Sequence, residues 1–239
     1  MQPRGVIITR PEPGLSESAA DVARLGWVPV LAPALHVRQC VLTGLPKQSA
    51  AVVLTSGQAV AAAAQSVALS VPVFAVGNAT AHKARMAGFT TVWSAQGNAQ
   101  DLAAMLVCQC APVQGALLLL SGAGQGLELA ASLRVHGFAV VRRVAYRTAP
   151  VVECPESVCH GLQAQQLGTI LFFSARSAQS WLNMVRQSSM WHQLLALRAV
   201  VISAVVAQTL HKAGWTGPVQ VAARPDAPAM LAALGRFEP

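Results

Sequence analysis

Short apolar runs alternate along the chain with stretches in which apolar residues recur at helical spacing. The runs are continuous, which is typical of parallel strands buried on both faces. Each run ends in small or turn-forming residues and leads into a helical stretch, so the fold class is predicted to be α/β. The predicted strands are residues 6–8, 27–30, 51–54, 73–76, 117–120, 169–173 and 199–202. The predicted helices are residues 16–25, 79–87, 127–135, 177–185 and 204–212.

The same pattern occurs twice in the chain. VFAVGNATAHKARMAGF at 73–89 parallels AVVISAVVAQTLHKAGW at 199–215, and VVLTSGQAV at 52–60 parallels ILFFSARSA at 170–178. The N-terminal VIITRP…ARLGW likewise parallels LLLLSG…RVHGF at 117–138. Such repetition predicts two βα domains of the same kind.

Two short extended segments, 36–39 and 144–149, lack strong helix formers and are predicted to be linkers between the domains. The chain would then cross twice. Residues 1–35 and 150–239 would form one discontinuous domain, and residues 40–143 would form a second domain inserted into it.

Composition argues against a membrane protein and against disorder. The chain is 54% hydrophobic and 11% charged, whereas disordered chains have the opposite balance. A spanning helix needs about 20 mostly apolar residues, and unbroken apolar runs such as 59–64 are far shorter than that. The N-terminus does not resemble a signal peptide and the five cysteines form no zinc spacing, so we expect a cytoplasmic protein with reduced thiols.

The charge balance favours a small anionic ligand. The 17 Lys and Arg residues exceed the 9 Asp and Glu residues and give a net charge of +8. Nucleic-acid-binding proteins usually cluster their basic residues, and here only Arg142, Arg143 and Arg147 lie together. We therefore expect no nucleic-acid partner.

Candidate binding residues follow the predicted strands, because ligands of open parallel sheets bind outside the carboxyl ends of the strands. Seven small polar loops lie there, at 9–10, 55–57, 77–80, 97–99, 121–122, 174–177 and 203. Backbone N–H groups at helix N-termini favour anions, and Arg10 and Arg176 could pair with carboxylates. A Ser, Thr or Asn in such a loop can instead only cap its helix, and that alternative stays open.

Familiar catalytic and cofactor motifs are absent from the sequence. There is no nucleophile elbow, phosphate-binding Walker loop or zinc-protease motif. The glycines of SGAGQG at 121–126 have the wrong spacing for a dinucleotide loop, and no acidic residue follows about 20 positions later. We expect no cofactor and no metal.

Taken together, these segments resemble the uroporphyrinogen-III synthase family. The resemblance covers nearly the whole chain and rests on ITRPEPGLSESAADVARLGWVPVLAPAL, VVLTSGQAV, VFAVGNATAHKARMAGF, GNAQDLAAML, VAYRTAP and ILFFSARSAQSWL. It implies two flavodoxin-like parallel-sheet domains joined by a two-stranded linker, the first made of both chain ends. It also implies cyclisation of hydroxymethylbilane, a linear tetrapyrrole with eight carboxylates, to uroporphyrinogen III, with inversion of the last pyrrole ring and loss of water, in heme biosynthesis.

The resemblance also assigns roles to particular residues. Tyr146, the only tyrosine, matches a linker tyrosine that can help the departing hydroxyl as a general acid; its alternative role is packing. Ser56, Thr80, Asn98 and Ser174 match family positions that line the substrate cleft.

One segment departs from the family. Where many relatives have a Gly-x-Thr-Thr or Gly-x-Ala-Thr turn, this chain has Ser203-Ala204-Val205-Val206, so Ser203 is the candidate for the missing contact. This departure also leaves open a second hypothesis, a non-catalytic two-domain module that binds anions or tetrapyrroles. For either function we expect a monomer, with transient contact to the enzyme that makes the bilane.

Overall fold

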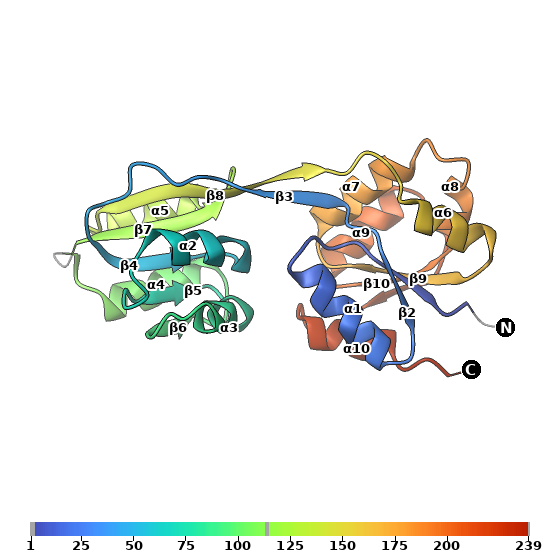
Figure 1. Cartoon of the computed structure of the whole chain (residues 1–239), viewed down its shortest axis with the longest axis horizontal. Coiled ribbons are helices and arrows are strands. Elements are labelled where there is room, and N and C mark those ends of the chain that lie inside the picture. Colours follow the sequence, from blue (N-terminus) through green and yellow to red (C-terminus); the bar gives the residue numbers. More distant parts are fainter. Residues whose placement is uncertain (1–2, 113–114, 239) are drawn as a thin grey trace. The chain divides into compact units, whose positions relative to one another are not determined.

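The structure, a computed structural model, describes residues 3–112 and 115–238. The chain forms two compact units. Unit 1 comprises Met1–Val37 and Ala149–Pro239, and unit 2 comprises Arg38–Thr148. The chain passes between them at β3 (Leu35–Gln39) and β8 (Val140–Pro150), which are hydrogen-bonded neighbours (Figure 1).

Unit 1 is built on a five-stranded sheet with the order β11-β10-β9-β1-β2, in which all strand pairs are parallel. Its strands are β1 (Gly5–Ile8), β2 (Val28–Leu31), β9 (Leu167–Phe172), β10 (Arg198–Val201) and β11 (Val219–Val221). Its helices are α1 (Gly14–Arg24), α6 (Glu156–Gln163), α7 (Ala175–Val185), α8 (Trp191–Leu195), α9 (Ala204–Lys212) and α10 (Ala227–Leu234).

Both faces of the unit 1 sheet are buried because successive side chains of a strand point to opposite faces. On β1, Ile7 packs with residues of α6, α7 and α9, whereas Val6 and Ile8 pack with residues of α1 and α10. This double burial explains why the strands read as continuous apolar runs.

Unit 2 is built on β4 (Ser49–Leu54), β5 (Val73–Ala75), β6 (Val92–Ser94), β7 (Ala116–Gly122) and β8. The sheet has the order β3-β8-β7-β4-β5-β6, and the pairs from β8 to β6 are parallel. Its helices are the 3-10 turn η1 (Gly57–Ala59), α2 (Val60–Ser66), α3 (Asn78–Met86), α4 (Ala99–Gln109) and α5 (Leu127–Val135). The four leucines of β7, residues 117–120, are fully buried, and each contributes about 1.5–3 kcal/mol relative to an exposed side chain.

The internal repeat corresponds to the order of the strands. By sequence, β4 matches β9, β5 matches β10 and β7 matches β1. Unit 2 reads β8-β7-β4-β5-β6 across its sheet and unit 1 reads β2-β1-β9-β10-β11, so matched strands occupy the same places. Unit 1 begins with the βα element that comes fourth in unit 2, and the two units are therefore circular permutations of one arrangement.

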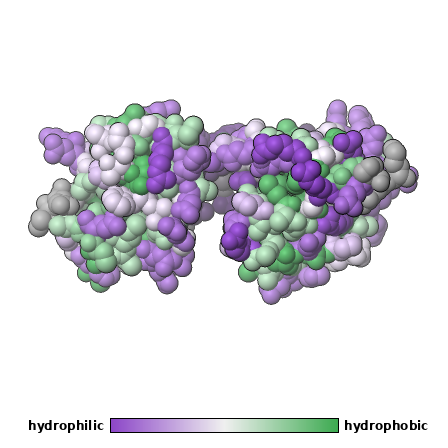
Figure 2. Space-filling view, turned by 90° about the horizontal axis from the view of Figure 1, so that it is seen from below, coloured by the Kyte–Doolittle hydropathy of each residue, from purple (hydrophilic) through white to green (hydrophobic). Residues whose placement is uncertain are grey.

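The surface is mixed in polarity. In the view of Figure 2, apolar and polar residues are interspersed over each unit. Large apolar side chains that are exposed, such as Val41, Met86 and Val135, are scattered along the sequence. Among the residues that the structure describes, no helix is long and apolar enough to cross a membrane.

Candidate functional site

The predicted site residues lie at the carboxyl ends of neighbouring strands within each unit. In unit 2, Tyr146 lies on β8, Ser56 follows β4, Thr80 lies in the first turn after β5 and Asn98 follows β6. Adjacent strands are about 4.8 Å apart, so the strand ends of unit 2 form an edge about 19 Å wide. In unit 1 the residues that follow β1, β9 and β10 lie at adjacent strand ends in the same way.

Tyr146 is held by the end of β7. The ring lies against Gly122, where a Cβ would come within 2.9 Å of Tyr146 Cζ. The side chain is 5% exposed, and its hydroxyl donates a hydrogen bond to Gln125 Oε1 at 3.3 Å. Gln125 itself is exposed. The ring of Tyr146 is therefore buried, while its hydroxyl points at the exposed amide of Gln125. The hydrogen bond between them is long, so an oxygen atom of a bound ligand can replace the amide as its acceptor.

Three predicted site residues cap helices. Ser56 accepts a hydrogen bond from the N–H of Gln58 at 3.3 Å. Ser174 accepts one from Ser177 at 3.0 Å and also donates its hydroxyl proton to Ser177 Oγ. Asn98 accepts two backbone bonds through Oδ1 within a capping box. All three side chains therefore cap helices. A capping oxygen acts as an acceptor, so the Ser56 hydroxyl proton and the Asn98 amide group can still donate to an anion.

The departure from the family pattern lies at the start of α9. Ser203 occupies the N-cap position there, but its side chain makes no capping hydrogen bond. In the repeat, Thr80 of α3 corresponds to Val206 of α9, and both side chains are buried, with 7% and 1% exposed. Val205 is 61% exposed beside Ser203. The turn therefore has one polar side chain, Ser203, and its hydroxyl is not used to cap the helix.

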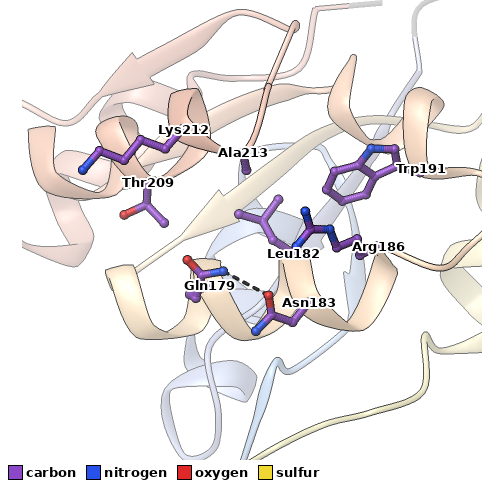
Figure 3. Close-up of a pocket in the computed structure, with 8 residues that line it drawn as sticks. All are labelled: Gln179, Leu182, Asn183, Arg186, Trp191, Thr209, Lys212 and Ala213. Atoms are coloured by element: carbon purple, nitrogen blue, oxygen red, sulfur yellow. Dashed lines mark hydrogen bonds between the residues drawn. The ribbon is translucent and has the colours of Figure 1, made fainter.

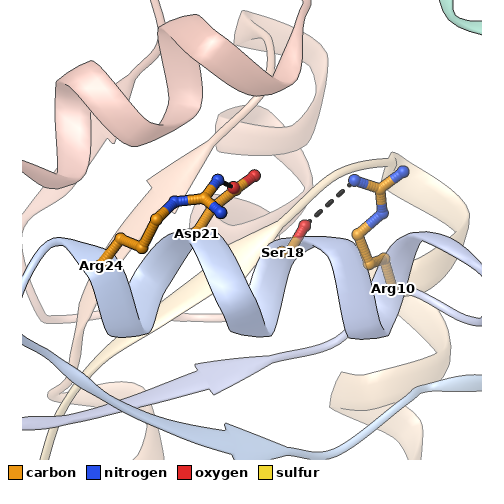
Figure 4. A network of polar contacts seen from close by, with 4 residues as sticks. All are labelled: Arg10, Ser18, Asp21 and Arg24. Atoms are coloured by element: carbon orange, nitrogen blue, oxygen red, sulfur yellow. Dashed lines mark hydrogen bonds and ion pairs between the residues drawn. The ribbon is translucent and has the colours of Figure 1, made fainter.

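Arg10 is the most constrained of the predicted cations (Figure 4). Its guanidinium lies 4.5 Å from the centroid of the Phe173 ring and donates a hydrogen bond to Ser18 Oγ at 3.1 Å. A side chain at Gly14 would overlap it. Burial lowers the pKa of Arg10, while Glu17 and two further acids oppose that shift. An arginine remains charged in such surroundings, so β1 ends in a fixed, partly desolvated cation.

Arg176 differs from Arg10. It lies in the first turn of α7 and is exposed. The structure therefore places it at the strand ends of unit 1, but on the surface of the helix.

Sequence reasoning missed three residues of this region. The charge spacing predicts that Lys83 belongs to the solvated face of a helix, yet its stem lies over Gly57, where a Cβ would come within 2.9 Å of Lys83 Cδ and 3.9 Å of Nζ. Phe173 supports Arg10, and Gln125 binds the phenol of Tyr146. The sequence feature that points to Lys83 is Gly57, directly after Ser56. Because this glycine has no side chain, it leaves room for the long side chain of Lys83 from α3.

The described residues also line several cavities. One of about 170 Å³ in unit 1 is bounded by α7, α8 and α9 and shares no residue with the candidate site. Figure 3 shows Gln179 hydrogen-bonded to Asn183 in its wall, with Arg186 and Lys212 nearby. Within residues 3–112 and 115–238, no group of three His, Cys, Asp or Glu side chains could hold a metal ion.

Comparison with known proteins identifies one family. The family model described as uroporphyrinogen-III synthase HemD matches residues 16–232. The crystal structure of uroporphyrinogen-III synthetase from Helicobacter pylori is similar with a TM-score of 0.62 and 15% identity, covering 96% of this chain and 97% of that chain. The wild-type uroporphyrinogen III synthase from Thermus thermophilus gives a TM-score of 0.40 and 18% identity, with coverages of 96% and 94%. A search of the curated proteins finds no match. At 15% identity the Helicobacter structure supports a shared fold.

Proposed function

The chain belongs to the uroporphyrinogen-III synthase family, and from that premise we propose how its own residues perform the family's reaction. That reaction is the cyclisation of hydroxymethylbilane to uroporphyrinogen III, with inversion of the last pyrrole ring and loss of water, in tetrapyrrole biosynthesis. The observation that carries the assignment is the family match over residues 16–232. The polar strand ends of both units agree with it.

The substrate carries eight carboxylates, and the strand ends offer mainly neutral donors for them. Ser56, Asn98 and Ser203 supply side-chain donors, and the backbone N–H groups of the first helical turns add to them. Arg10 supplies a planar cation that can bind a carboxylate through two N–H groups. Thr80, Ser174 and Arg176 complete the proposed set of substrate contacts.

The chemistry requires positioning more than a strong acid or base. Loss of the hydroxyl group leaves a cationic azafulvene, which the last ring attacks through a spiro intermediate. Tyr146 donates its phenolic proton to the departing hydroxyl as a general acid. The bound conformation then favours attack at the position that inverts the ring, and the low content of acidic residues avoids repulsion of the substrate carboxylates.

The architecture supports a finer description. We propose that the units are two similar flavodoxin-like domains, residues 1–35 with 150–239 and residues 40–143, joined by the two-stranded linker of residues 36–39 and 144–149. In chain order, the unit 1 sheet reads 2-1-3-4-5, which is the flavodoxin order. We also propose a cytoplasmic monomer that contacts the bilane-forming enzyme transiently.

The activity is tested by the isomer that forms. Purified protein supplied with freshly generated hydroxymethylbilane should yield uroporphyrinogen III, measured by chromatography after oxidation to the porphyrins. Without enzyme, the substrate cyclises to isomer I, which is the background. Isomer I alone would overturn the assignment, and tight tetrapyrrole binding without turnover would identify a non-catalytic module.

Lys83 gives a second prediction for the unit 2 strand ends. Lys83→Met should raise KM about five-fold and change kcat little, because one partly screened contact between an ammonium and a carboxylate contributes about 1 kcal/mol. Lys212 of α9 offers a control, since α9 matches α3 in the repeat but Lys212 lines the separate cavity of Figure 3. Lys212→Met should leave KM unchanged. Equal effects of the two substitutions would show that only net charge matters.

A further inference from the structure

Cys154 and Cys159 flank the start of α6, in the segment that follows β8. Pro155 is the N-cap of this helix, so Cys154 immediately precedes the cap and Cys159 is the fourth helical residue. Apolar side chains at these two positions commonly pack together and fix the direction in which the chain enters a helix. In this chain both positions hold a thiol, and Cys159 is near enough to Cys154 to contribute to the shift of its pKa.

The surroundings of the pair leave it accessible. Both cysteines are partly buried free thiols. Cys154 packs against the core of unit 1 on one side, and on another it lines an open cavity of about 410 Å³ together with Val151 and Glu153. A small oxidant can therefore reach the sulfur atoms while the helix start keeps them together.

Burial lowers the reactivity of the Cys154 sulfur. Burial, with a smaller contribution from Cys159, raises the pKa of the Cys154 thiol to about 12. A thiol of this kind is almost entirely protonated at neutral pH, and the thiolate is the form that attacks an oxidant. Cys154 is therefore slow to react with an oxidant, and its attack on an oxidised Cys159 relies on the placement of the two residues together at the helix start.

We propose that Cys154 and Cys159 form a reversible intramolecular disulfide, a redox-modification site separate from the substrate site. Hydrogen peroxide oxidises the Cys159 thiol to a sulfenic acid: an S–O bond forms, the O–O bond breaks, and the thiol proton leaves with the second oxygen as water. Cys154 Sγ then attacks Cys159 Sγ, the S–O bond breaks, and a second water leaves as the S–S bond forms. Two thiols lose two electrons, which reduce one peroxide to two waters, and a dithiol reductant reverses the step.

The remaining cysteines provide internal controls. Cys108 and Cys110 lie at the end of α4, two residues apart, and side chains at that spacing on a helix do not face each other. Cys40 follows β3. We expect these three thiols to stay free under oxidation that converts the α6 pair.

The test uses the full chain treated with a small excess of peroxide. Free thiols should fall from five to three, and a Glu-specific protease, which cuts after Glu156 between the two cysteines, should release peptides joined until a reductant is added. In Cys154→Ser, the sulfenic acid of Cys159 should persist and react with dimedone, whereas Cys108→Ser should still form the linked peptides. Loss of thiols without that link, or a link that includes another cysteine, would overturn the proposal.

Discussion

Replacing Tyr146 with phenylalanine should lower kcat for uroporphyrinogen III by about 100-fold, because general acid catalysis typically contributes about 10²- to 10⁴-fold. The ring should keep its place against Gly122, since only the hydroxyl is removed. The lost hydrogen bond is a 3.3 Å contact to an exposed glutamine. KM and thermal stability should therefore change little. Initial rates measured with the III isomer separated from background isomer I give the comparison.

Gln125 distinguishes an acid from a packing residue. Gln125→Ala removes the hydrogen-bond acceptor of the phenol but leaves the acidic proton, so kcat should fall less than in Tyr146→Phe. If Tyr146 only packs, both variants should retain the full rate. A normal rate in Tyr146→Phe, with the melting temperature unchanged, would remove the residue from the mechanism.

The central strands could be predicted from sequence because burial on both faces leaves a clear signal. β7 has four consecutive leucines that are all fully buried, and its predicted place was correct. The edge strands β6 and β11 were missed, since each has three residues and is only partly buried. α10 was missed for another reason. Seven of its eight residues are apolar and the other is proline, so no periodicity marks them as a helix.

For the candidate site, features set by neighbouring residues could be predicted from sequence, whereas contacts between residues far apart in the chain could not. Ser56 and Ser174 could be placed at helix starts because a strand, a small polar residue and a helix follow one another in sequence. Asn98 follows the missed strand β6 and was placed by its small polar loop and the family resemblance alone. The partners of Arg10 and Tyr146 could not be predicted. Phe173 is 163 positions from Arg10 and is brought beside it by the pairing of β1 with β9. Gln125 reaches Tyr146 because β7 pairs with β8.

The circular permutation gives the turn that departs from the family pattern an equivalent turn in unit 2. Matched strands occupy the same places in the two sheets, so each unit offers an equivalent turn after β5 or β10. The unit 2 turn has Thr80, whereas the unit 1 turn has Val206 and keeps only the hydroxyl of Ser203. Unit 1 has Arg10 at the end of β1, and its counterpart β7 ends in Ser121-Gly122. The two units thus distribute charge and neutral donors differently on one framework.

Arg10→Met should lower kcat/KM by about 10- to 100-fold. A hydrogen-bonded charge pair contributes about 1.5–3 kcal/mol, and each 1.4 kcal/mol is about a factor of ten. The folded protein should not be weakened in parallel, because burial already lowers the pKa of Arg10 and so disfavours its charged form. A methionine can occupy the space between Phe173 and Gly14 without that cost. Steady-state kinetics and a thermal melt of each variant measure the two effects separately.

Arg24 supplies the matched control from the same helix region. It is an exposed arginine that pairs with Asp21 (Figure 4), and Arg24→Met should leave kcat/KM unchanged. Arg10→Lys keeps a cation but loses the planar group that stacks on Phe173 and can bind a carboxylate through two N–H groups, so it should recover only part of the activity. Full recovery by lysine would mean that charge alone is required at this strand end. An equal loss in Arg24→Met would mean that the net charge of unit 1, and not the position of Arg10, draws the carboxylates to the site.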